Sequence, residues 1–289
     1  MESKPYLGII GGSGIYDLKN LKNTKWVNIK SSYGKPSDQI LTGKIGKTNL
    51  AFLPRHGKSH NLIPSEINYR ANIDCLKQLG VTDIISLSAV GSLKENIKPG
   101  QFVIVDQFID RTIARKKTFF DAGIVAHVSM AKPVSKKLSE IILKSAPNDT
   151  EVILGGTYLA MEGPQFSSLA ESELYRSWNC DVIGMTNMPE AKLAREAEIA
   201  YATVAMVTDY DCWHPEHDSV TVENIIKILH SNSNKAKILV NNIVKHINNN
   251  DWKFDDPAYT ALDNAIITPP EARSTEALSK IHNIASRLI

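Results

Sequence analysis

The chain has 289 residues, of which 43% are hydrophobic, and its 33 Lys and Arg residues nearly balance its 31 Asp and Glu residues. This length and apolar content allow one large α/β domain or two ordinary ones and exclude disordered and fibrous proteins. With a formal net charge of +2 and no long basic run, the sequence does not predict a nucleic-acid surface. We find no signal-peptide pattern and no apolar stretch long enough to span a bilayer, so we expect a cytoplasmic protein without a membrane partner.

Short apolar runs alternate along the chain with stretches of helical periodicity, a pattern typical of a doubly wound α/β sheet. We predict strands at residues 7–10, 51–53, 81–87, 102–105, 182–185 and 199–207. We predict helices from Pro64 to the stop at Gly80, from the capping-box pair Ser168 and Glu171, across 221–247 and near 278–288. The segment 221–247 fits one long helix or two joined ones. The sequence shows no internal repeat and no clear domain linker.

Several of the predicted strands end in groups suited to an oxyanion. The first opens into Gly11–Gly14, a turn in which backbone amides and the Ser13 hydroxyl can approach a ligand closely. Later strand ends carry Arg55, His56, Ser88 and Thr186. The arginine fork and the further donors together predict a phosphate cradle. Each residue alone has an ordinary alternative, such as a helix cap for Ser88 or a surface charge for Arg55.

Common cofactor motifs do not fit. Counting from Gly12–Gly14, the third glycine of a dinucleotide fingerprint would fall on Asp17. The run also lacks the Gly-Lys-Ser/Thr ending of a nucleoside-triphosphate loop. Cys75, Cys180 and Cys212 are widely spaced and lack the paired spacing of a zinc site, so we predict reduced thiols. These observations argue against redox and ATP-driven enzymes.

Two acids follow the longest apolar run. Residues Ile199 to Val207 form that run, and Asp209-Tyr210-Asp211 comes directly after it. The end of a buried strand is where an open α/β sheet places its chemistry. If the chain stays extended there, the two carboxylates share a side, and one of them holds a proton more readily than an isolated acid. Such a pair is suited to protonating a nitrogen leaving group. The alternative is that one acid only caps the turn that follows.

Eight stretches resemble a single enzyme family, in the order in which that family carries them. They are GIIGGSG (8–14), PRHGKSH (54–60), NYRANI (68–73), SAVGSL (88–93), DQFIDRT (106–112), MEGPQFSS (161–168), MTNMPEAKLAREA (185–197) and TDYDCW (208–213). As a set they resemble the S-methyl-5'-thioadenosine phosphorylase branch of the purine nucleoside phosphorylase family. The resemblance extends from about Leu7 to about Leu239.

The resemblance implies a single α/β domain whose central mixed, partly barrel-like sheet is flanked by helices. It implies a nucleoside phosphorylase domain over residues 1–250 and a C-terminal extension over residues 251–289, packed on the same domain or on a neighbouring subunit. The implied reaction is phosphorolysis of S-methyl-5'-thioadenosine to adenine and 5-methylthioribose 1-phosphate, which would serve purine and methionine salvage. Inorganic phosphate would be the co-substrate, without a metal or other cofactor. The active assembly would be a trimer or a multiple of one, such as a hexamer.

The family motifs also imply roles for individual residues. Phosphate would be held by Ser13, Arg55, His56, Ser88 and Thr186, with the backbone near Ala89 at the junction with the sugar. Substrate would be contacted by Phe166 and Ile183 at the base, Met185 at the ribose, and Val222 and Ile226 at the methylthio group. Two histidines are also implicated: His60 in the phosphate loop, and His127, which would close a neighbouring subunit's pocket unless it is an ordinary polar loop residue. Asp209 would bond purine N7 and the 6-amino group, with Asp211 in support.

Two positions separate close relatives. Members that act on 6-oxopurines place Glu where this chain has Ser167 and Asn where it has Asp209. A carboxylate accepts a hydrogen bond from a 6-amino group but repels a 6-carbonyl, so adenine-type bases are favoured. Three alternatives stay open: a 6-oxopurine or methylthioinosine phosphorylase, a nucleosidase that uses water, and a noncatalytic purine-nucleoside-binding module.

Overall fold

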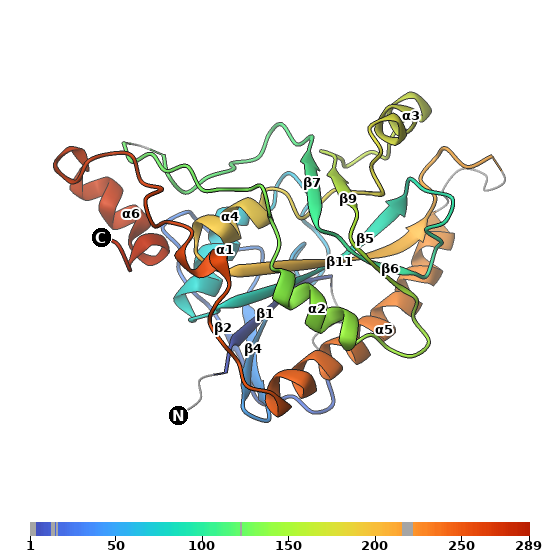
Figure 1. Cartoon of the computed structure of the whole chain (residues 1–289), viewed down its shortest axis with the longest axis horizontal. Coiled ribbons are helices and arrows are strands. Elements are labelled where there is room, and N and C mark those ends of the chain that lie inside the picture. Colours follow the sequence, from blue (N-terminus) through green and yellow to red (C-terminus); the bar gives the residue numbers. More distant parts are fainter. Residues whose placement is uncertain (1–3, 13–14, 16, 122, 216–221) are drawn as a thin grey trace.

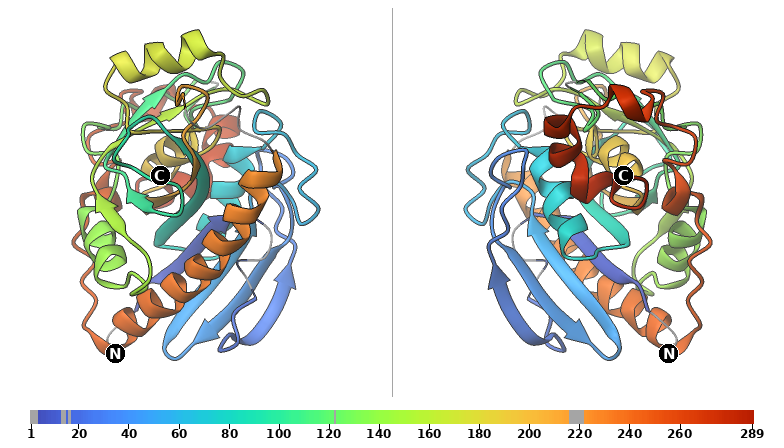
Figure 2. Two further views of the ribbon diagram at one scale, coloured as in Figure 1. Left: turned by 90° about the vertical axis from the view of Figure 1, so that its right-hand side faces the viewer. Right: turned by 90° about the vertical axis from the view of Figure 1, so that its left-hand side faces the viewer.

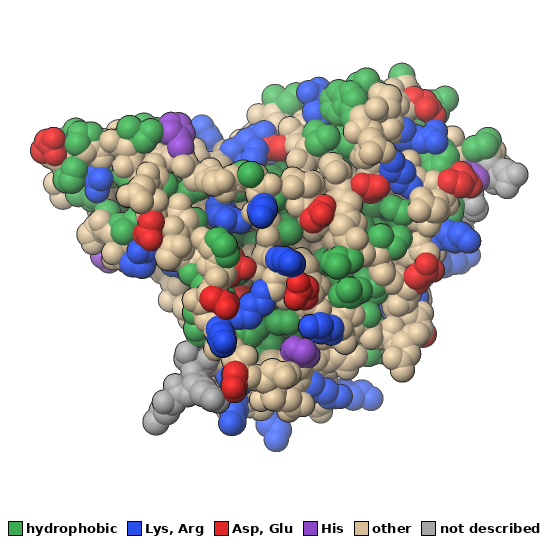
Figure 3. All heavy atoms as spheres, in the orientation of Figure 1, with side chains coloured by type: hydrophobic (Ala, Val, Ile, Leu, Met, Phe, Trp, Pro, Cys, Tyr) green, Lys and Arg blue, Asp and Glu red, His purple; other side chains and the backbone are tan. Residues whose placement is uncertain are grey.

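The computed structural model describes residues 4–12, 15, 17–121, 123–215 and 222–289, and of residues 222–225 only the backbone. A mixed β-sheet forms the middle of the molecule, and helices cover both of its faces (Figure 1). Figure 3 shows Lys and Arg interspersed with Asp and Glu over one side of the surface. No helix in the described part of the chain is long and apolar enough to cross a membrane.

The sheet contains eleven strands in the described residues: β1 (Tyr6–Gly11), β2 (Lys22–Val27), β3 (Ile40–Ile45), β4 (Thr48–Pro54), β5 (Asp83–Ser92), β6 (Phe102–Ile104), β7 (Gln107–Asp110), β8 (Val152–Leu154), β9 (Thr157–Ala160), β10 (Val182–Gly184) and β11 (Ala200–Asp209). The helices are α1 (Tyr69–Gln78), α2 (Lys136–Lys144), α3 (Leu169–Ser177), α4 (Glu190–Glu196), α5 (Val222–Asn249) and α6 (Thr275–Ala285), with 3₁₀ turns η1 (Pro257–Thr260) and η2 (Pro270–Ala272). All six strands predicted from apolar runs are confirmed.

Strand β5 is the branch point of the sheet. One edge of β5 pairs in parallel with β11 along almost its whole length. The other edge is shared, because β1 pairs in parallel with residues 83–86 and β10 pairs antiparallel with residues 91 and 92. The sheet is therefore mixed, as expected, and the described strands do not close into a barrel. Between β1 and β10, residues 87–90 have no strand beside them on this edge, which leaves a gap in the sheet.

Two hydrophobic cores lie on opposite faces of the sheet. One core contains Ile73 of α1, Leu193 of α4 and Ile281 of α6, all at most 1% exposed. The other contains Leu138 of α2 and residues of α5 such as Leu239. Figure 2 shows α5 (orange) running diagonally across the molecule beside the N-terminal strands (blue). Because both faces are covered, the central strands β5 and β11 are buried along most of their length.

Some element boundaries differ from the prediction. Helix α1 begins at Tyr69 and not at Pro64, because Asn68 caps it by accepting a hydrogen bond from the Ala71 amide. Gly80, with a φ of 85°, confirms the predicted stop. Strand β5 continues to Ser92, since its pairing with β11 extends past Leu87. The strands β2, β3, β7, β8 and β9 were not predicted, because they are short or carry many polar residues.

The last forty residues pack on the body of the fold. α5 is one continuous helix, and after it the chain returns along the molecule to place α6 beside α1 (Figure 2). Arg287 pairs with the buried carboxylate of Glu198 at 2.6 Å. The Tyr259 hydroxyl donates to Asp83 at the start of β5, at 2.8 Å. These contacts are made within one chain, and the division of the sequence at residue 250 stays a prediction.

We expect Tyr259→Phe to destabilise the fold in a pH-dependent way. Burial raises the pKa of Asp83 from 3.8 to about 6, so stability falls as the pH rises through this interval, where the folded protein binds more protons than the unfolded chain. Without the Tyr259 hydroxyl the ionised carboxylate loses a donor, at a cost of about 1–3 kcal/mol. Denaturant unfolding should show a larger loss at pH above 6 than near pH 4.

Tyr6→Phe is the matched control, because the Tyr6 hydroxyl makes no hydrogen bond with the described residues and its loss should change little. Equal losses for the two variants, or a loss at Tyr259 that does not depend on pH, would contradict the assignment of this contact.

Candidate active site

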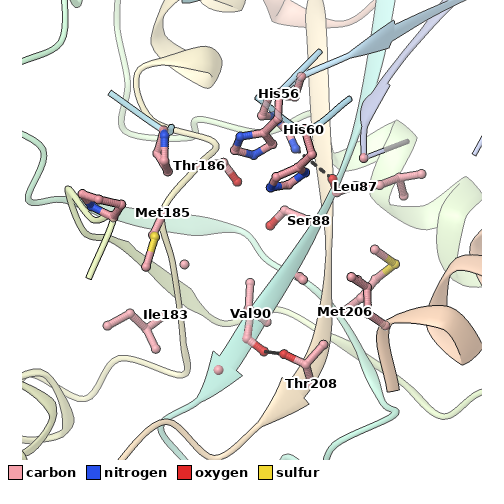
Figure 4. Close-up of a pocket in the computed structure, with 18 of the residues that line it drawn as sticks. His56, His60, Leu87, Ser88, Val90, Ile183, Met185, Thr186, Met206 and Thr208 are labelled. Carbon is pink, nitrogen blue, oxygen red and sulfur yellow. Dashed lines mark hydrogen bonds between the residues drawn. The ribbon is translucent and has the colours of Figure 1, made fainter. Parts of the chain in front are cut away.

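A cavity of about 510 Å³ lies at the gap in the edge of β5 (Figure 4). The carboxyl ends of β1, β4 and β11 converge on it, which is where open α/β sheets bind ligands. Its remaining walls come from residues 87–91 of β5, the chain leaving β10, the loop at 60–64 and helix α5. Because β10 runs antiparallel to β5, the chain beyond Gly184 runs back along β5 and brings Thr186 toward Ser88.

Most residues predicted from the sequence meet in this cavity. Those that line it are Arg55, His56, His60, Ser88, Ala89, Phe166, Ile183, Met185, Thr186, Asp209 and Asp211. Ser13 and the side chain of Val222 lie outside the described residues. Two other predicted residues do not line the cavity: Ile226, which is 44% exposed, and His127, which is exposed on a distant loop.

Helix α5 contributes different side chains from the one expected. Leu229 and Ser233 line the cavity, whereas Ile226 lies one turn nearer the start of the helix and points outside it. The three residues share a helix face, since they are three and four positions apart. Helical periodicity indicates this face, but only the packing of α5 on the sheet decides which turn of the helix reaches the cavity. Met206 of β11 and Ile15 are further lining residues that the sequence analysis missed.

Arg55 is the most constrained charged group of the site. It follows the last residue of β4 and is only 2% exposed, so the alternative of a surface charge is wrong. Its guanidinium makes a bidentate pair with Glu190, with Nε to Oε2 at 2.9 Å and Nη2 to Oε1 at 3.1 Å. Nη1 donates to the Leu87 carbonyl at 3.0 Å and Nη2 to the Ser86 hydroxyl at 2.5 Å. Of the five N–H groups, one on Nη1 is left for a ligand.

Glu190 stands at the start of α4 and closes a buried polar network. Its carboxylate is 1% exposed and accepts a hydrogen bond from the Tyr201 hydroxyl at 2.9 Å. Burial opposes ionisation, but the charge of Arg55 and these hydrogen bonds hold the pKa of Glu190 below its ordinary value. The Asn187 amide oxygen lies 3.1 Å from the same hydroxyl oxygen, and the Asn187 NH₂ group donates to Thr203 at 2.9 Å. The network joins the end of β4 to β5, β11 and α4, and the sequence analysis did not detect it.

His56 is held by its own loop. Its Nδ1 lies 2.9 Å from the Leu62 carbonyl oxygen, and the Leu62 amide donates to the His56 carbonyl oxygen at 3.2 Å. The His60 ring stacks on the His56 ring, with 4.5 Å between their centroids and 20° between their planes. Figure 4 shows the two imidazoles on the side of the cavity toward Ser88 and Thr186. Burial lowers the pKa of His56 to about 4, and the neighbouring charge of Arg55 acts in the same direction.

The hydroxyl groups of the expected cradle come from β5 and from the chain that follows β10. Ser88 lies within β5, so the alternative of a helix cap is wrong, and its Oγ is 3.3 Å from the Tyr158 hydroxyl. Thr186 is 6% exposed and faces the same space from the chain after β10. Ala89, between them, is exposed toward the cavity. Hydroxyls, an imidazole and a guanidinium N–H are thus gathered at one end of the cavity.

The two aspartates occupy the opposite end. Asp209 closes β11, and its Oδ1 accepts from the Asp211 amide at 2.8 Å while the Thr208 hydroxyl lies 2.7 Å from its Oδ2. Asp209 therefore does cap the turn, and it lines the cavity as well. The chain does not stay extended, because Asp211 has a φ of 54°. Burial raises the pKa of both carboxyls, and the charge of Asp211 adds to the effect on Asp209.

Small and apolar residues shape the space beside the acids. A side chain at Gly91 would lie 2.9 Å from Asp209 Oδ1, so the absence of one lets the carboxylate lie against β5. Ile183 is 3% exposed, and Phe166, at 55%, stands at the mouth of the cavity. The Ser167 carbonyl accepts a hydrogen bond from Cys212 Sγ at 3.3 Å. All three cysteines are free thiols, as predicted. No cluster of His, Cys, Asp or Glu among the described residues is arranged to hold a metal ion.

An open mixed sheet with a cavity and a pair of buried acids at the carboxyl ends of its strands is the arrangement of an α/β enzyme. The model of the phosphorylase superfamily matches residues 6–245, and the chain belongs to that family. The family expected from the eight sequence motifs is therefore confirmed.

Named relatives are similar over their full length. The S-methyl-5'-thioadenosine phosphorylase of Rhodospirillum rubrum is 55% identical, over 99% of this chain and 98% of the relative. That of Bradyrhizobium diazoefficiens is 56% identical over 98% of each. A crystal structure of a methylthioadenosine phosphorylase from an Antarctic soil metagenomic library superposes with a TM-score of 0.92, at 47% identity over 97% of this chain and 99% of the other. The structure of the Schistosoma mansoni methylthioadenosine phosphorylase in complex with adenine superposes with a TM-score of 0.79. It is 35% identical and covers 86% of this chain and 93% of the other.

We expect Glu190→Gln to destabilise the protein strongly. The substitution leaves the Arg55 charge buried without its counter-ion, which costs about 3–5 kcal/mol in comparable buried pairs. The loss should appear as a lower free energy of unfolding in urea, with an unchanged slope.

Glu173→Gln is the control, because it breaks an exposed pair with Arg176 on the surface of α3, worth about 0–1 kcal/mol. Similar losses for the two variants would show that the buried pair does not contribute as argued.

Proposed function

We propose that the protein catalyses the phosphorolysis of S-methyl-5'-thioadenosine to adenine and 5-methylthioribose 1-phosphate. The observation that carries the proposal is that donors suited to phosphate and a pair of buried acids face one cavity from opposite ends. The full-length similarity to proteins of that name supports the choice of substrate. The roles predicted from the sequence for the residues that line the cavity are part of this proposal.

The proposal gives the two groups of residues different roles. Phosphate binds beside Arg55, His56, Ser88 and Thr186 and attacks C1' as the bond to the purine breaks. Positive charge then develops on the sugar and negative charge on the base, as in glycoside cleavage. Asp209, whose pKa burial raises, shares a proton with purine N7 and relieves the charge on the leaving adenine. Asp211 keeps Asp209 in place through its backbone amide.

Different lining residues would contact the base and the 5' substituent of the nucleoside. At the base, Asp209 accepts from a 6-amino group and repels a 6-carbonyl, which disfavours the 6-oxopurine and methylthioinosine alternative. At the 5' carbon of the ribose, Met206 and Leu229 offer apolar surface for a methylthio group. Such a pocket discriminates only modestly between a thioether and a hydroxyl, so adenosine is expected to be a slower second substrate.

We also propose that the protein is active as a trimer or a hexamer. His127 lies on a short ribbon in which Ala126 pairs with Ile266. Two apolar side chains on this ribbon, Val125 and Ile267, are 47% and 62% exposed. A second copy covering them would exclude this apolar surface from water and would bring His127 to a neighbouring cavity. The cytoplasmic location stays a prediction.

The proposal is tested by release of free base from methylthioadenosine and from inosine, each with and without phosphate. We expect adenine release that requires phosphate and little turnover of inosine. Release without phosphate would favour the nucleosidase, preference for inosine would favour the 6-oxopurine enzyme, and nucleoside binding without turnover would favour the binding module.

Asp209→Asn sharpens the test. The amide cannot supply a proton, so kcat/KM for methylthioadenosine should fall about 10²–10⁴-fold, while the ratio of inosine to methylthioadenosine turnover rises. Asp255→Asn is the control, because Asp255 lies on the surface with a side chain that is 62% exposed. Full adenine release by the Asp209 variant would overturn the role assigned to this carboxyl.

A further inference from the structure

The hydrogen bond between His56 and Leu62 determines which ring nitrogen carries the proton. A carbonyl oxygen can only accept, so the 2.9 Å contact with Leu62 O requires a hydrogen on Nδ1. The loop holds this arrangement from both sides, because the amides of Asn61 and Leu62 donate back to the His56 carbonyl oxygen at 3.1 and 3.2 Å. In the neutral ring, Nε2 is then an acceptor and not a donor.

The surroundings of the ring keep it neutral. Burial lowers the pKa of His56 to about 4, and Arg55 and His60 lower it further, against the opposing effects of the Leu62 hydrogen bond and of Glu190. Nε2 makes no hydrogen bond with the described residues, and the ring lines the cavity. An acceptor lone pair therefore faces a space in which the other groups near it are donors.

The charges and donors of the cradle also favour an anion that carries a proton. Arg55 is neutralised within the protein by its bidentate pair with Glu190 and keeps one free N–H. The hydroxyls of Ser88 and Thr186 can donate to any anionic oxygen. No further described Lys or Arg side chain lines the cavity. A tetrahedral anion in this place would meet several donors and one acceptor, and only an anion that still carries a proton can satisfy the acceptor.

We propose that His56 Nε2 accepts a hydrogen bond from the P–OH group of phosphate, so that the site prefers protonated tetrahedral oxyanions and binds sulfate more weakly. Phosphate and arsenate both keep a proton at neutral pH, whereas sulfate of nearly the same size and charge has none. Sulfate oxygens would place a lone pair against the lone pair of Nε2. The inference rests on the proposed function only in that it takes phosphate as the anion bound beside His56.

The first test is calorimetric titration of the protein with phosphate, arsenate and sulfate at neutral pH, without nucleoside. We expect arsenate to bind about as tightly as phosphate and sulfate to bind about 10- to 100-fold more weakly, the value of one hydrogen bond to a charged group. Sulfate binding as tightly as phosphate would overturn the proposal. The readout does not depend on turnover: anion selectivity without adenine release would reject the proposed function alone, and phosphate-dependent turnover without selectivity would reject this inference alone.

Two variants separate the acceptor from the rest of the cradle. His56→Gln places an amide near the ring position, and its NH₂ can turn toward the anion and donate, so the preference for phosphate over sulfate should largely disappear. Ser88→Ala is the matched control. Loss of this hydroxyl donor should weaken the binding of both anions and leave the ratio of their dissociation constants unchanged. An unchanged ratio in the His56 variant, with both anions still bound, would contradict the assignment.

The pH dependence distinguishes an acceptor from an imidazolium donor. The charged and titratable groups that face the ring are Arg55, His60 and Glu190, with Asp209 across the cavity. With a neutral ring, the selectivity stays constant from neutral to alkaline pH, and sulfate binds more tightly only as the pH falls toward the pKa of about 4. If the ring is instead an imidazolium cation when the anion binds, the binding of both anions weakens as the pH rises through neutrality. That result would overturn the proposal.

Discussion

The buried pair of Arg55 and Glu190 is the constraint on which the site depends. Two charges taken out of water are tolerated only when their hydrogen bonds are satisfied, and here Ser86, Tyr201 and the Leu87 carbonyl complete the set. These partners come from four separate segments: the end of β4, the middle of β5, the start of α4 and β11. Because an unpaired charge at this depth would cost several kcal/mol, the four segments must keep one relative position. The floor of the cavity is rigid for that reason.

The position of the cavity follows from the topology of the sheet. A strand has two edges, and β5 gives one of them to β11 while β1 and β10 share the other. The two strands leave residues 87–90 without a strand beside them, and a backbone in that state needs other partners or a ligand. On this edge the Leu87 carbonyl accepts from Arg55. The Val90 carbonyl accepts from the Thr208 hydroxyl on the side of β11, as Figure 4 shows. The remaining gap lies at the carboxyl ends of three parallel strands, which is where open α/β sheets bind ligands.

The sequence predicts the parts of this structure that local patterns specify. Long apolar runs identify β5 and β11, and the spacing of Ser168 and Glu171 identifies the capping box of α3. Eleven of the residues named from the motifs line one cavity, and their roles stay predictions. The motifs do not predict that Leu229, and not Ile226, reaches the cavity, because this depends on the position in which α5 packs along the sheet. The Arg55–Glu190 pair also escapes prediction, since its members are 135 positions apart and neither carries a local signal of the other.

Burial favours the uncharged form of three titratable groups that line the cavity. It raises the pKa of Asp209 and Asp211 and lowers that of His56, while the only buried pair of full charges among the described lining and supporting residues, Arg55 and Glu190, cancels internally. The protein therefore contributes little net charge to the space in which the bond breaks. Under the proposed function, the charge that faces a cationic sugar would come from the bound anion itself, and a low local polarity would strengthen its effect. The protein's part is then to orient that anion by hydrogen bonds and to hold a proton where the base departs, which is what a neutral imidazole and a carboxyl of raised pKa are able to do.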